Sequence, residues 1–283
     1  MGETRSSSEA FQPLGNEQRT AVIEALYDDG PKTQSFSALA EAIEADTTAG
    51  FAYHLRQLTG HYLRETENGY TLTDAGVRVA RAIESGAFTE SIDRSPTEID
   101  DPCPFCDASA LEAQTHDNTV TVRCSSCEAS LLRLAFPPGG HRTHTDETIP
   151  TAVNRLYRHR INTLCDGFCP TCGATAQATM NHRSVGELER AQVHLACTRC
   201  GYQIDCPVTA TVLDHPAVVS FYYERGETLE NRPLWNVGSE WGERVLSDNP
   251  WCVQVTTTID GDELALLVGE DTTVVSVTET SGV

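Results

Sequence analysis

Apolar positions recur at helical spacing through the first ninety residues of the chain. We expect residues 1–13, which are mostly polar, to be disordered. Asn16 follows them and can cap a first helix. Within that helix Val22, Ile23 and Leu26 form one apolar stripe. The pattern therefore predicts an amphipathic helix that packs against a core.

Two further helices are indicated over residues 37–45 and residues 48–58. In the second of them, Phe51, Leu55 and Leu58 recur at i, i+4 and i+7, which puts them on one face. The opposite face is polar or small. This helix is thus expected to have a buried side and an exposed side.

A hairpin and one more helix complete the N-terminal region. Asn68-Gly69 lies between alternating segments of residues 62–72, and this dipeptide is a strong short-range hairpin signal. Thr73 can then cap a fourth helix. Three helices, a hairpin and a helix predict a winged helix-turn-helix domain over residues 14–90, in which the third helix enters the major groove of DNA.

The expected DNA contacts lie on the exposed side of the third helix and on the hairpin wing. They are Thr48, Ala49, Ala52, Tyr53, Arg56, Arg64 and Asn68. Simple solvation is the alternative for Tyr53 and Arg56. His54 adjoins the apolar stripe and is expected to be a packed histidine.

The segments LGNEQRTAVIEAL, FSALAEAI, TTAGFAYHLRQLTG and LRETENGYTLTDAGVRVARAI carry a family resemblance. Over about residues 14–86 the chain resembles the ArsR-type winged-helix transcription regulators, in the version common in halophilic archaea. The resemblance implies a DNA-binding homodimer that associates through the first and last helices of the domain. Arsenic sensors of that family use cysteines near the recognition helix. The first cysteine here is Cys103, which argues against arsenic sensing at that place.

Four Cys-x-x-Cys pairs follow this domain. Two thiolates on a tight turn hold one face of a tetrahedral zinc ion, and a second pair completes the coordination. The eight expected ligands are Cys103, Cys106, Cys124, Cys127, Cys169, Cys172, Cys197 and Cys200. They predict two structural zinc ions in two zinc ribbons, with consecutive pairs sharing an ion. A cross-braced pairing is the less favoured alternative.

The remaining organisation is indicated by proline, charge and strand patterns. Residues 91–102 are acidic and contain proline, so we expect a linker. Residues 103–164 and residues 165–230 each have the pattern of a zinc ribbon followed by a helix, which indicates an internal repeat. Residues 231–283 contain three predicted strands. The fold class is therefore α+β: a winged helix-turn-helix, two zinc-ribbon/helix repeats and a small antiparallel β region.

Other chemistries for the cysteines are less well supported. A redox pair needs one Cys-x-x-Cys at a helix start, not four pairs at ribbon spacing. A zinc deaminase also needs His-x-Glu, which is absent from the sequence. Cys165 could serve as an alternative ligand. Because four thiolates fill the zinc coordination, and no hydrolase motif occurs, we expect no enzyme activity.

Charge suggests the environment of the protein. The chain has 41 acidic and 20 basic residues, a net charge of −21, and a single lysine, Lys32. Such a surface is typical of proteins adapted to high salt, where self-repulsion is screened. A generally acidic protein from ordinary conditions is the alternative. No apolar run is long enough to span a bilayer and no secretory signal is evident, so we expect a cytoplasmic protein without a membrane partner.

Two functions are consistent with these patterns. The first is a sequence-specific transcription regulator that binds double-stranded DNA as a homodimer and contains structural zinc. The second is a zinc-ribbon adaptor, in which the winged helix docks protein in place of DNA.

Overall fold

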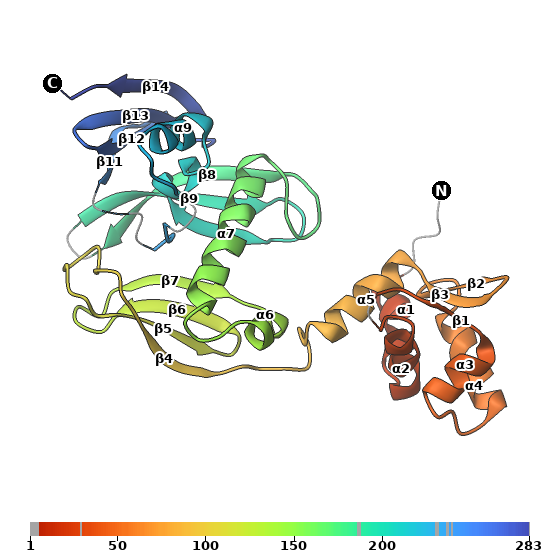
Figure 1. Ribbon diagram of the computed structural model, residues 1–283. Helices are drawn as coiled ribbons and strands as arrows, with labels where there is room; N and C mark the ends of the chain where they lie inside the picture. The colour runs from red at the N-terminus through yellow and green to blue at the C-terminus, as the bar shows by residue number, and fades with distance from the viewer. Residues whose placement is uncertain are drawn as a thin grey trace. The chain divides into compact units, whose positions relative to one another are not determined.

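The computed structural model of the protein describes residues 6–28, 30–185, 188–229, 232–235, 238 and 240–282 (Figure 1). The chain divides into two compact units. The first unit contains Met1–Ser91 and Pro137–Thr143, and the second contains Ile92–Phe136 and His144–Val283. Each unit is described by itself below.

The first unit is mainly helical. Its elements are α1 (Ser7–Phe11), η1 (Gln12–Leu14), α2 (Glu17–Ala25), β1 (Thr33–Gln34), α3 (Phe36–Ala42), α4 (Thr48–Leu58), β2 (Leu63–Thr66), β3 (Gly69–Leu72), α5 (Asp74–Glu84) and α6 (Pro138–Thr143). The three strands form a sheet in the order β1-β3-β2. The unit has one hydrophobic core, and Ile23, Leu39, Leu55 and Leu63 are among its fully buried side chains.

Side-chain caps fix where these helices begin. Asn16 accepts a hydrogen bond from the Arg19 N–H at the start of α2, and Thr73 accepts one from the Gly76 N–H at the start of α5. Both residues are the caps that the sequence predicts. Thr47 does the same for α4. Each cap satisfies an N–H group that has no partner inside its helix.

The disorder expected for residues 1–13 is wrong for the described part of that segment. Ser6 and Glu9 form a reciprocal capping box that starts α1. The Tyr62 hydroxyl donates to the Ala10 carbonyl and attaches this helix to the rest of the unit. Residues 1–5 lie outside the described residues. The Ser-x-x-Glu pattern at Ser6 was the available sequence signal.

The helix α6 belongs to the first unit although its neighbours in sequence belong to the second. The Gly139 N–H donates to the Ser85 carbonyl over 2.9 Å, just beyond the C-terminus of α5. The Arg142 guanidinium pairs with the Glu90 carboxylate and donates to the Glu84 carbonyl. Carbonyls at the end of α5 therefore find their partners in a segment that is distant in sequence.

The second unit contains three antiparallel sheets and three helices in its described residues. Its elements are β4 (Arg94–Ile99), β5 (Leu111–His116), β6 (Thr119–Cys124), β7 (Ser130–Ala135), α7 (Ile149–Cys165), β8 (Ala176–Val185), β9 (Leu188–Cys197), β10 (Gln203–Pro207), α8 (Val208–Val212), α9 (Pro216–Glu224), β11 (Trp241–Asp248), β12 (Trp251–Ile259), β13 (Asp262–Gly269) and β14 (Val274–Thr280). The strand orders are β4-β5-β6-β7, β10-β9-β8 and β11-β12-β13-β14.

The prediction of a linker at residues 91–102 is also wrong. Within it, β4 pairs antiparallel with β5 and forms an edge of the first sheet. Its polar side chains suit an edge strand, which is exposed to water. Pro96 falls where the register shifts between Arg94 and Thr97, and a bulge on an edge strand tolerates the missing N–H. Polar composition alone therefore does not distinguish this edge strand from a linker.

One large core joins most of the second unit. It includes Ile161 of α7, Val193 and Leu195 of β9, and Val255 and Leu266 of the C-terminal sheet. Figure 1 shows α7 beside β8 and β9, and the C-terminal sheet against α9. The expected boundary between residues 165–230 and residues 231–283 is therefore not a boundary between separate cores. The C-terminal sheet also has a fourth strand, β11, which the sequence pattern did not predict.

Candidate metal centres and outer face of helix α4

The first cysteine cluster joins the turn before β5 to the turn after β6. The Cys103 and Cys127 sulfurs are 3.7 Å apart, and the Cys106 and Cys124 sulfurs are 3.7 Å apart. All four sulfurs lie within 4.8 Å of one another. Cys103 and Cys124 are buried, whereas Cys106 and Cys127 are exposed.

The second cluster has the same arrangement in the second ribbon. The Cys169 and Cys200 sulfurs are 3.6 Å apart, as are the Cys172 and Cys197 sulfurs. Burial follows the same alternation, with the first cysteine of each pair buried. Two segments of different sequence therefore build one geometry.

These distances fit a tetrahedral ion. A zinc ion with Zn–S bonds of about 2.3 Å has sulfur–sulfur edges of about 3.8 Å. The measured separations of 3.6 and 3.7 Å are close to that value. The two four-cysteine clusters are thus compatible with two zinc ions. Consecutive pairs form each cluster, which is the sequential arrangement, and Cys165 belongs to neither cluster.

Backbone N–H groups favour the thiolate form of one buried ligand in each cluster, Cys124 and Cys197. The Cys200 N–H, and next the Arg199 N–H, point to the Cys197 sulfur and lower the pKa of that thiol to about 6. In the first cluster the Cys127 N–H acts in the same way and lowers the pKa of Cys124 to about 7. Since metals bind the thiolate, these N–H groups prepare both clusters for a cation.

The residue after each second cysteine has a left-handed backbone. Gly173 and Gly201 have φ of 73° and 72°, and glycine adopts this region without strain. Asp107 and Glu128 occupy the equivalent places in the first ribbon, with φ of 56° and 59°. The turn geometry is therefore the same in both ribbons, while its conformational cost differs.

The outer face of α4 is open within its own unit. Thr48, Ala49 and Arg56 are exposed, Tyr53 is 50% exposed, and Ala52 is half-buried. The opposite face is closed, because Phe51, Leu55 and Leu58 are at most 2% exposed. On the hairpin, Arg64 and Asn68 are exposed as well. His54 is half-buried, with its ring edge-on to Tyr53 at 5.5 Å.

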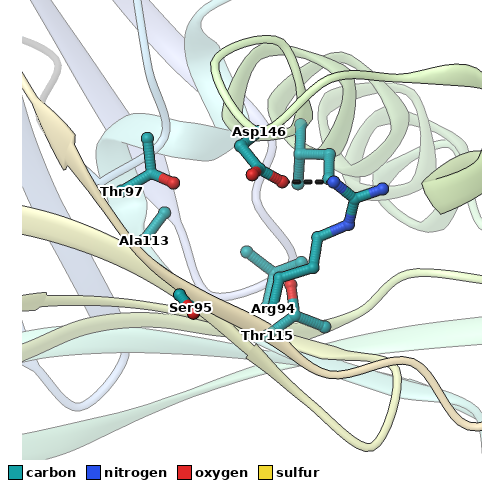
Figure 2. Close-up of a pocket in the computed structure, with 8 residues that line it drawn as sticks. Arg94, Ser95, Thr97, Ala113, Thr115 and Asp146 are labelled. Atoms are coloured by element: carbon teal, nitrogen blue, oxygen red, sulfur yellow. Dashed lines mark hydrogen bonds and ion pairs between the residues drawn. The ribbon is translucent and has the colours of Figure 1, made fainter.

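A small hollow lies between β4, β5 and the start of α7. Figure 2 shows Arg94 and Asp146 forming an ion pair across it, near Thr97 and Thr115. Its volume is about 10 Å³. A single water needs a volume of about 10–15 Å³, so this hollow has no room for an organic ligand.

The two four-cysteine clusters fit the zinc-ribbon type of site and are compatible with two zinc ions. The chain belongs to the family described as Domain of unknown function (DUF7351), whose model matches residues 100–274. Residues 7–83 match the model of a second family, described as Domain of unknown function (DUF7347). No curated protein and no solved structure matches the chain. In the described part of the chain, no helix combines the length and apolar character needed to cross a bilayer.

Proposed function

We propose that this protein is a sequence-specific transcription regulator that binds double-stranded DNA and contains two structural zinc ions. The outer face of α4 carries the proposal. That face is exposed along Thr48–Arg56, while the other side of the helix is anchored in the core by Phe51, Leu55 and Leu58. A helix held in this way can insert into a major groove without exposing its apolar side.

The elements around α4 support the same proposal. Helices α2, α3 and α4, the β2–β3 hairpin and α5 follow one another in the order of a winged helix-turn-helix domain. Arg64 on β2 and Asn68 in the turn would contact a neighbouring groove or phosphates. By the family resemblance, the protein would bind as a homodimer.

Zinc would act as a folding element in this proposal. Cys103, Cys106, Cys124 and Cys127 would hold one ion, and Cys169, Cys172, Cys197 and Cys200 the other. When bound, each ion links two turns through its thiolate ligands. Four thiolates leave no open coordination position, so the ions would be structural.

Footprinting on the promoter region of the protein itself, in concentrated potassium chloride, tests the proposal. The wild type should protect a defined site. Arg56→Ala should weaken that binding by about 10- to 100-fold, the effect of losing a base contact. Arg133→Ala, which removes an exposed arginine from β7, is the control and should bind as the wild type does.

The adaptor function remains the second candidate because the first unit is acidic. Residues 1–90 contain 14 acidic and 7 basic residues. Absence of any protected site, with a chain that is folded and loaded with zinc, would favour the adaptor. Equal footprints for Arg56→Ala and the wild type would contradict the assignment of α4 to the DNA contact.

A further inference from the structure

The sheet of the second ribbon has one face in the core and one face open. On β9, Ala191, Val193 and Leu195 alternate inward and are at most 4% exposed. The alternate residues Arg190, Gln192 and His194 point the other way and are exposed or half-buried. In a strand, successive side chains point to opposite faces, so these three lie on one outer face.

The neighbouring strands extend this outer face. The register sets Arg183, Asn181 and Thr179 of β8 directly opposite Arg190, Gln192 and His194. On the other side of β9, Asp205 of β10 is opposite His194. Arg183, Asn181, Thr179 and Asp205 are all exposed. The face therefore presents rows of guanidinium, amide, hydroxyl and imidazole groups.

Charge on this outer face differs from the rest of the chain. Arg183 and Arg190 are directly opposite each other, and like charges in that position destabilise a sheet. The acidic residue of these rows, Asp205, accepts a hydrogen bond from the His194 ring over 2.7 Å. The chain as a whole carries a net charge of −21. Two directly opposed, exposed arginines on an acidic protein indicate an anionic partner.

The type of anionic partner follows from the side chains. Arginine, asparagine, glutamine and threonine are residues that contact phosphate and sugar in protein–DNA complexes. The rows just named contain no phenylalanine, tyrosine or tryptophan, and the nearby Phe105 ring has Arg190 over one of its faces, which disfavours stacking of unpaired bases and hence a single strand. From Arg190 to Ala196 the face extends over about 20 Å, or about six base pairs of a duplex.

We propose that the outer face of β8, β9 and β10 binds the phosphodiester backbone of duplex DNA. This surface rests on the proposed function and adds to it a second contact, independent of sequence, from the zinc-ribbon unit. Arg190 also lies over the Phe105 ring, 5.6 Å from its centroid. The turn of the first cysteine cluster therefore limits the positions available to this arginine.

Arg183→Glu in the full, zinc-loaded chain tests the proposal. Because glutamate opposite Arg190 replaces repulsion with attraction, the melting temperature should stay equal or rise. Affinity for a random duplex should nevertheless fall about 10-fold, and the slope of log affinity against log salt should decrease by about 1–2. Arg133→Glu, with the same charge change on the first ribbon, should leave both quantities near the wild-type values.

Each outcome separates this surface from the α4 site. If Arg56→Ala abolishes site-specific binding while Arg183→Glu binds every duplex as the wild type does, the surface is rejected and the proposed function stands. If no specific site exists but Arg183→Glu weakens random-duplex binding, the surface stands and the proposed function fails. Failure of the wild type to bind any duplex overturns both. An effect restricted to single-stranded RNA would also overturn the assignment to duplex DNA.

Discussion

The two ribbons share one metal-ligand geometry and differ in almost everything around it. Their sulfur separations are 3.7 Å and 3.6 Å, and both alternate buried and exposed cysteines. Yet the first ribbon uses Asp107 and Glu128 where the second uses Gly173 and Gly201. The same cluster geometry therefore tolerates different residues in the surrounding turns.

The outer faces of the two ribbons carry different charged pairs. On the first ribbon Arg123 pairs with Glu112 over 2.6 Å, and Glu98 is directly opposite Glu112. On the second ribbon the directly opposed pair is Arg183 and Arg190. On the first face, one of two directly opposed carboxylates is paired with an arginine. On the other face, two like charges are directly opposed.

Their cores differ as well. The first cluster lies among a few side chains that include Leu111, Val122 and Trp235. Strands of the second ribbon contribute Met180, Val193, Leu195 and Ile204 to the large core of the unit, whereas β6 of the first ribbon contributes Val120. Damage to the second cluster should therefore reach further through the protein than damage to the first.

The largest expected effect on stability comes from replacing one cysteine ligand of a cluster. Cys197→Ser and Cys103→Ser should each reduce bound zinc from two ions to one, measured by native mass spectrometry. Zinc binding supplies about 10–16 kcal/mol in small zinc domains, so each loss should lower the melting temperature. Cys197→Ser should lower it more, because β9 belongs to the large core.

Cys252→Ser provides the control, since Cys252 is half-buried in β12 and outside both clusters. It should keep two ions. Equal melting temperatures for Cys197→Ser and Cys103→Ser would show that the two clusters support the fold equally, in spite of their different cores.

A smaller effect on stability is expected from substitutions at the positions with a left-handed backbone. Asp107→Gly and Glu128→Gly should each stabilise the zinc-loaded protein by about 1 kcal/mol, and Gly173→Asp should destabilise it by a similar amount. No heavy atom lies within 4 Å of a Cβ added at Gly173, so backbone strain alone would act there. Denaturant midpoints measure both. A change of the same sign in both ribbons would contradict the strain argument.

The smallest expected effect is on the local stability of the first ribbon at low pH. The Asp117 N–H, over 2.8 Å, and then His116 lower the pKa of Asp93, which joins the start of the first ribbon to the β5–β6 turn. A lowered pKa in the folded state means that this contribution is present above the ordinary carboxyl pKa. It is lost as the pH falls through the lowered value.

As the pH is lowered, the Asp117 N–H should therefore lose its protection from hydrogen exchange at a higher pH than the Ala191 N–H of the second ribbon does. Asp93→Asn should remove the acid dependence of the protection factor at the Asp117 N–H, which is the exchange rate corrected for its intrinsic dependence on pH. Exchange at Asp117 that follows the same acid profile in the wild type and the variant would refute the role of this carboxylate.

Local signals explain what the sequence could predict. Helix α4 has the predicted bounds, because its apolar stripe and a threonine cap act within a dozen residues. The Asn16 and Thr73 caps follow for the same reason. The cysteine clusters were also accessible, since ligand spacing along the chain determines which turns can share an ion.

Non-local contacts explain what the sequence could not predict. Strand β4 is polar and exists through its pairing with β5. Strand β11 depends on its register with β12 in the same way. The outer face of β8, β9 and β10 required the register of three strands before Arg183 and Arg190 could be recognised as opposite. None of these pairings has a signature within a single segment.

The assignment of α6 to the first unit has a practical consequence. Because Pro137–Thr143 completes the end of α5 through Gly139 and Arg142, no single cut in the chain yields both units intact. A fragment that stops near Ser91 would lose those partners and expose the last carbonyls of α5. The polypeptide passes from the first unit to the second, returns, and passes to the second again, so each unit can be produced intact only as part of the same chain.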